Sequence, residues 1–77
     1  MILKNLKHAE VRPGDILVWA TDPVDDDRPR YDLVVSVDVT GEFVYFWSLE
    51  LSTLKLWSSQ STYKSTPLDP YVFRVNP

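Results

Sequence analysis

The 77-residue sequence has no cysteine, two glycines and one histidine. Without cysteine there is no disulfide framework and no thiolate zinc site, which fits a reducing compartment. Gly14 and Gly41 are too few to build a glycine-rich phosphate loop. Apolar runs of signal-peptide or membrane-spanning length are also missing, so we expect a soluble, cytoplasmic protein.

Basic residues are in the minority. Eight Lys and Arg stand against eleven Asp and Glu, which gives a formal net charge of -3. A protein whose affinity comes from neutralising phosphates needs the opposite sign. The charge therefore argues against nucleic acid as the main partner.

Catalytic signatures are lacking as well. His8 has no partner at the level of sequence, and we interpret it as a surface residue. No serine or threonine lies in a strand-to-helix nucleophile motif. Pairs of carboxylates for glycoside hydrolysis would have to come from Asp32, Asp38, Glu42, Glu50 and Asp69. A domain this small has little volume for a substrate cleft, so we predict no enzyme and no catalytic residue.

Three consecutive acids, Asp25, Asp26 and Asp27, are the one candidate for a cation site. Calcium loops alternate their ligands and require a glycine at the sixth position, whereas Arg28 and Pro29 follow here. The sequence therefore favours a solvated acidic loop over residues 22–30, with no metal and no cofactor.

What the chain does contain is aromatic residues, 13 % of the total, and short apolar runs separated by turn residues. Pro13 followed by Gly14 indicates a type II turn. Residues 1–12 fit either a helical turn or a short edge strand. The pattern predicts strands over residues 15–21, 31–39, 42–50, 54–57 and 71–75. Residues 54–57 also fit a helical turn, and residues 58–66 read as a polar loop.

The longest predicted element is a hairpin over residues 31–50. A loop of three residues, 39–41, places Gly41 at a left-handed position. This register puts one set of side chains toward the core: Leu33, Val35, Val37, Phe43, Tyr45 and Trp47. The other face then carries Val34, Ser36, Asp38, Val44, Phe46, Ser48 and Glu50.

These elements predict an all-β fold, a single domain over residues 1–77 forming a small five-stranded antiparallel barrel or roll. The chain resembles SH3-like barrels in its Pro13-Gly14-Asp15 entry to the first strand, in the acidic loop that follows it, and in the turn at Asp69-Pro70. The paired tryptophans of the peptide-binding members are replaced by Phe46-Trp47. The resemblance thus implies a fold and not proline-peptide binding.

Surplus aromatic residues motivate the leading hypothesis on function. Large rings are favoured anchors at protein interfaces. We expect a non-enzymatic module that binds a protein partner, or a second copy of itself, through an aromatic patch rimmed by the acids at 25, 26 and 27. The patch consists of Phe46, Trp57, Val34 and Val44. The alternative is a purely structural role, in which these rings cover the second side of a sheet. Small acidic chains of this style are typical of phage or mobile-element inhibitors of a host protein.

The alternative hypothesis is a nucleic-acid or nucleotide binder. In that case Trp57 and Tyr63 stack on bases, and Lys64 with the hydroxyl-rich segment 58–66 contacts phosphates. The net negative charge disfavours it.

Overall fold

The computed structural model describes residues 1–20 and 29–75, and this part of the chain is all-β. Most of its strands are runs of β-branched and aromatic residues, which favour extended backbone. The elements are β1 (Ile2–Leu3), the 3-10 helix η1 (His8–Glu10), β2 (Ile16–Trp19), β3 (Arg30–Thr40), β4 (Phe43–Glu50), β5 (Leu56–Ser58), β6 (Thr62–Tyr63) and β7 (Tyr71–Phe73). No helix in the described residues has the length and apolarity to cross a membrane.

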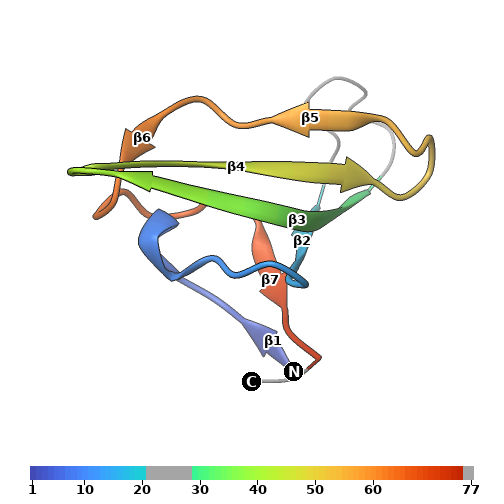
Figure 1. Cartoon of the computed structure of the whole chain (residues 1–77). Helices are drawn as coiled ribbons and strands as arrows, with labels where there is room; N and C mark the ends of the chain where they lie inside the picture. Colours follow the sequence, from blue (N-terminus) through green and yellow to red (C-terminus); the bar gives the residue numbers. More distant parts are fainter. Residues whose placement is uncertain (21–28, 76–77) are drawn as a thin grey trace.

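One antiparallel sheet contains every strand, in the order β1-β7-β2-β3-β4-β5, and β6 pairs with the start of β4. Figure 1 shows the long strands β3 and β4 crossing the molecule, with β5 and β6 on one side of them and β7 and β1 on the other. The predicted small antiparallel β-domain is therefore confirmed. It is an open roll, because β1 and β5 end the sheet without pairing with each other. Two short strands, β1 and β6, add to the five predicted.

The turn that leads into β2 forms as predicted. The Asp15 amide donates to the Arg12 carbonyl at 3.1 Å, and Gly14 between them has a φ of 94°. Proline at the second position and a residue of positive φ at the third define a type II turn. This turn starts the strand one residue later than predicted, at Ile16.

The β3–β4 hairpin forms over nearly the predicted range, but its loop is different. Thr40 pairs with Phe43, so the loop holds two residues, Gly41 and Glu42. Gly41 has a φ of 59° and stands in the first loop position, which is where a type II′ turn requires glycine. The predicted three-residue loop over 39–41 was wrong because it counted glycine as the last loop residue.

A β-bulge at Val35 changes the face that β3 presents. Before the bulge Val34 pairs with Ser48, and after it Val37 pairs with Phe46. One extra residue on β3 therefore turns Val34 and Val37 to the same side of the sheet. The predicted inner face was wrong for β4, where the even-numbered side chains point inward and the odd-numbered ones point outward. It was also wrong for Leu33 and Val35 on β3, whereas Val37 packs against the core as predicted.

The hydrophobic core lies on the side of the sheet toward which the even-numbered residues of β4 point. It consists of Val11, Leu17, Val34, Phe46, Leu68 and Val72, with Leu3, Leu6 and Val37 packed against it. Two segments cover the face, the N-terminal stretch through η1 and residues 64–70. They are joined by backbone hydrogen bonds from His8 to Thr66 (2.9 Å) and from Leu68 to Leu6 (2.8 Å). Coverage by these segments decides which face of the hairpin is buried.

The connection from β4 to β5 is a tight turn. The Leu54 amide donates to the Glu50 carbonyl at 2.7 Å, and Leu54 itself has a φ of 61°. Leu54 and Leu56 are 70 % and 52 % exposed, so neither leucine belongs to the core. The strand itself is confirmed as β5.

Candidate functional site

The outer face of the sheet carries a continuous row of apolar side chains. Residues paired across neighbouring strands lie on the same face, so the registers define the row directly. From β1 to β5 it reads Ile2, Phe73, Ile16, Leu33, Leu49 and Leu56. No described element packs over it, and its end residues Ile2 and Leu56 are more than half exposed.

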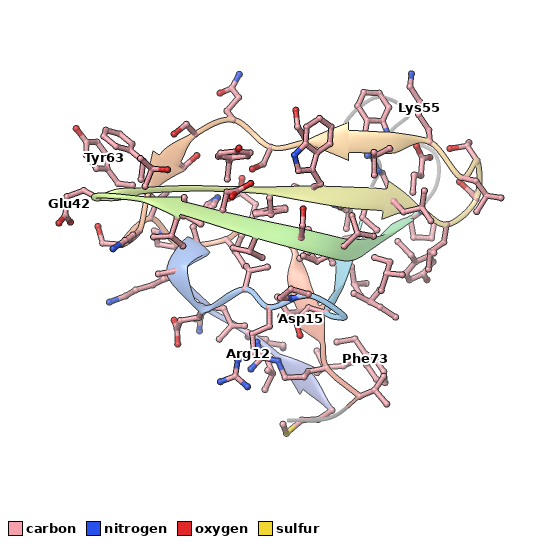
Figure 2. The ribbon with its side chains drawn as sticks, viewed as in Figure 1. Arg12, Asp15, Glu42, Lys55, Tyr63 and Phe73 are labelled. Atoms are coloured by element: carbon pink, nitrogen blue, oxygen red, sulfur yellow. The ribbon has the colours of Figure 1, made fainter. Side chains whose placement is uncertain are left out.

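Aromatic side chains extend this face along β4. Phe43 and Trp47 are 41 % and 37 % exposed, and Tyr45 lies between them. The ring of Tyr63 stacks on Phe43 with centroids 4.7 Å apart and is itself 60 % exposed. Figure 2 shows Tyr63 beside Glu42, at the hairpin end of the molecule. We call the apolar row together with these four aromatic residues the outer face.

Charge is nearly absent from the outer face. Among its paired positions in the described strands, Asp38 is the one charged residue, and it lies opposite Tyr45. The Asp38 carboxylate favours the protonated form of the Tyr45 hydroxyl and so raises the pKa of Tyr45 above its usual value of 10.0. The hydroxyl therefore stays protonated, and the face is apolar with a single acidic spot.

The aromatic patch predicted from sequence is not on the surface. Val34, Val44 and Phe46 are at most 6 % exposed and belong to the inner side of the sheet, so their assignment as surface contacts was wrong. The reason is the changed phase of the hairpin. Trp57 is half-buried on the same inner side. The acids Asp25, Asp26 and Asp27 lie outside the described residues.

The inner side has an apolar half and a polar half. Where β3 begins and β4 ends, polar side chains occupy the inward positions. They are Arg30, Asp32, Ser48 and Glu50, all at most 9 % exposed. A cavity of about 320 Å³ opens here. Its walls include Trp19, Arg30, Asp32, Phe46, Trp57 and Asp69. We call this cavity the inner pocket.

An ion pair forms one wall of the inner pocket. The Arg30 Nε lies 2.9 Å from Asp32 Oδ1 and 3.1 Å from Oδ2. The guanidinium also lies over the ring of Trp57, at 5.0 Å from its centroid. Lys55 Nζ approaches the same ring at 4.2 Å. Both cations therefore make cation–π contacts with the ring of Trp57.

Glu50 holds Trp57 in place. The Trp57 Nε1 donates to Glu50 Oε1 at 3.0 Å, and the Ser52 hydroxyl donates to Oε2 at 3.1 Å. The bond from Trp57 is the largest cause that lowers the pKa of Glu50 below its usual value of 4.5, with Arg30 adding to it. Trp57 is thus a fixed wall and not a free surface anchor.

Two further residues of the pocket have notable surroundings. His8 is half-buried and lines the pocket, and its Nδ1 donates to the Thr66 carbonyl at 2.7 Å. This contradicts its interpretation as a surface residue. Within the described residues, the Trp19 Nε1 is enclosed by protein and has no hydrogen-bond partner. An enclosed donor of this kind destabilises the folded state.

The residues of the nucleotide hypothesis do not come together. Trp57 lines the inner pocket, whereas Tyr63 lies on the outer face. Figure 2 shows Tyr63 and Lys55, two residues before Trp57, at opposite ends of the molecule. The Lys64 backbone is tied to Glu42 and Ala9 by hydrogen bonds near the Tyr63 end. A single stacking and phosphate-binding site therefore does not form from these three side chains.

Sequence reasoning missed the polar wall of the pocket. Arg30 and Asp32 alternate on one strand, as Ser48 and Glu50 do on the next. That alternation was present in the sequence, but it was assigned to a solvent-facing side. The signal that distinguishes the two is the bulge at Val35, which no residue pattern marked.

Over the residues that the structure describes, no group of three or more His, Asp or Glu side chains is arranged to hold a metal ion. The fold and its two surface features define a small all-β domain with an uncovered apolar sheet face and a polar inner pocket. No family model, no curated protein and no solved structure matches the chain. Similarity to SH3-like barrels stays a prediction.

Proposed function

We propose that this protein is a non-enzymatic interaction module, and that its outer face binds another protein chain, in the first instance a second copy of itself. One observation carries the proposal, the row of six paired apolar residues that runs from β1 to β5 and is covered by no other element of residues 1–20 and 29–75. Large contiguous apolar patches on a folded domain mark interaction sites.

Size supports this proposal. A specific interface buries roughly 800 Å² on each partner. The molecule measures 36 × 24 × 19 Å, and the apolar row crosses all strands from β1 to β5, so the outer face has the dimensions for such an interface. Sheets that pack face to face interdigitate side chains of this kind.

Charge supports a second copy as the partner. The chain has a net charge of -3, which opposes close approach of two copies. On the outer face, however, the paired positions carry only Asp38. Two copies that meet through this face keep most of their like charges apart and exposed to solvent.

Sedimentation of the intact chain over a range of concentrations tests the proposal. We expect a reversible dimer in the wild type and a monomer in the double variant Trp47→Thr, Leu56→Thr, because threonine keeps β-propensity while removing apolar area. Val75→Thr is the matched control, since Val75 is 65 % exposed and lies outside the paired strands. The control should remain a dimer.

A wild type that is monomeric at every concentration would overturn self-association. Equal dimerisation of the wild type and the double variant would show that some other surface carries it. Circular dichroism of all three proteins establishes that the sheet is intact.

A further inference from the structure

The inner pocket has the size and the walls of a small-molecule site. Its volume of about 320 Å³ lies at the lower end of the range of ligand pockets, which begins near 300 Å³. Apolar contacts come from Leu17, Phe46, Leu68 and Pro70, and the ring of Trp19 adds an aromatic wall. Such a cavity fits one ring with a short substituent.

A buried ion pair in the wall sets this pocket apart from a packing defect. Arg30 and Asp32 have side chains that are 9 % and 4 % exposed. Burying an ion pair gives little net stability, because desolvation opposes the Coulomb attraction. In a 77-residue chain with a thin core, inward positions are scarce. Their use for charged residues beside a cavity points to recognition of a ligand.

The electrostatics of the pocket favour a cation. Among the described residues that line it, Arg30 is the one Lys or Arg side chain. Two carboxylates stand against it: Asp32 and Asp69. The balance is one negative charge, so an anionic ligand is repelled and a cationic one is attracted.

Asp32 is the group that a cation meets. Both of its oxygens share the single Nε–H of Arg30, whereas a carboxylate offers about four acceptor sites. Acceptor capacity therefore remains on a carboxylate that lines the cavity. Asp69, which is exposed, lines the same cavity near its rim. The faces of aromatic rings add attraction for a positive charge.

From these observations we infer that the inner pocket binds a small organic ammonium ion, with the ammonium group on Asp32 and the apolar part against Phe46 and Leu68. This site is on the opposite side of the sheet from the outer face. Its occupancy is therefore independent of self-association.

Three probes that share a phenylethyl group and differ in charge test the inference: 2-phenylethylammonium, 2-phenylethanol and 3-phenylpropanoate. Each is titrated into the ¹⁵N-labelled full chain at pH 7 and followed by the indole N–H signals. We expect the ammonium to shift the signals of Trp19 and Trp57, which line the pocket, and to leave that of Trp47 in place. It should bind about tenfold tighter than the alcohol, since a charge-assisted hydrogen bond is stronger than a neutral one.

Two variants with the same change of net charge separate the pocket from the general field of the protein. Asp69→Asn should weaken binding of the ammonium about threefold, whereas Asp38→Asn on the outer face should leave it unchanged. Both residues are exposed, so both variants are expected to fold. The inference is overturned if the carboxylate probe binds tightest, if Asp38→Asn weakens binding as much as Asp69→Asn, or if no probe shifts Trp19 and Trp57 at about 10 mM.

Discussion

Arg74 clamps Asp15 with two charge-assisted hydrogen bonds, from Nε to Oδ1 and from Nη2 to Oδ2, both at 2.8 Å. The two residues are 59 positions apart, and their side chains are only 11 % and 2 % exposed. The same guanidinium donates to the Glu10 carbonyl at 3.0 Å. The pair therefore ties the end of β7 to the turn before β2 and to the segment that covers the core.

Removing the arginine should be strongly destabilising. Arg74→Met leaves the Asp15 carboxylate buried without its partner, and such a loss costs about 3–5 kcal/mol of the free energy of unfolding. Lys7→Met is the matched control, because Lys7 is exposed and its side chain makes no comparable pair with the residues that the structure describes. Urea denaturation at pH 7 measures both variants. A loss below about 1 kcal/mol for Arg74→Met would contradict the conclusion that this ion pair is buried and stabilises the fold.

The lowered pKa of Asp15 predicts how the free energy of unfolding depends on pH. Burial raises the pKa of Asp15, but the hydrogen bonds from Arg74 and from the Arg12 backbone outweigh it and hold the pKa below its usual value of 3.8. The unfolded chain then binds a proton at higher pH than the folded one, so the stabilisation is present above the unfolded pKa and is lost as pH falls through the folded value.

Urea midpoints at pH 7, 5 and 3 should therefore decline most steeply at the acid end, and Asp15→Asn should flatten that decline. An identical decline in the variant would assign the acid sensitivity to other carboxyl groups.

Gly41 should tolerate a D-residue but not an L-residue. Its φ of 59° is unfavourable for L-amino acids by roughly 1–2 kcal/mol, while no neighbouring atom lies within 4 Å of an added Cβ. Gly41→Ala is expected to lower the free energy of unfolding by about that amount. D-alanine introduced at the same position by chemical synthesis fits the same backbone and should not destabilise. Equal effects of the two enantiomers would rule out the type II′ turn.

Trp57 should control the ionisation of Glu50. In Trp57→Phe the ring stays but the donor to Glu50 Oε1 is lost. Because this bond is the main cause of the lowered pKa, the pKa of Glu50 should rise toward its usual value of 4.5. A ¹³C titration of the side-chain carboxyl signals measures it. An unchanged Glu50 titration would show that Ser52 and Arg30 suffice.

The sequence predicted those parts of the fold that depend on local chemistry. Proline before glycine sets the turn at Pro13 and Gly14, and alternating β-branched residues set the hairpin range. It did not predict which face of the hairpin is buried, because both faces carry apolar side chains: Val44 and Phe46 on one, Tyr45 and Trp47 on the other. Which face is buried depends on the segments that cover it, and those contacts are between residues far apart in the chain.

The positions of the candidate site residues could not be predicted from the sequence for the same reason. An extra residue at Val35 reverses the phase of half a strand, and no turn residue marks a bulge between valines. Arg30 was assigned to the solvated loop 22–30, and Ser48 and Glu50 to the face of the hairpin away from the core, although all three line or back a cavity. That the chain carries more apolar rings than its core can hold was evident from composition, yet the exposed rings among the described residues are Tyr31, Phe43, Trp47, Tyr63 and Tyr71, not Phe46.

Binding of another copy to the outer face can be followed by the three tryptophan indole signals in ¹H–¹⁵N spectra recorded over a concentration series. Trp47 lies on the outer face, while Trp19 and Trp57 line the inner pocket. We expect the Trp47 signal to move and to gain protection from solvent exchange as concentration rises, with the other two signals unchanged. A Trp47 signal that is independent of concentration, or a shift confined to Trp19 and Trp57, would contradict it.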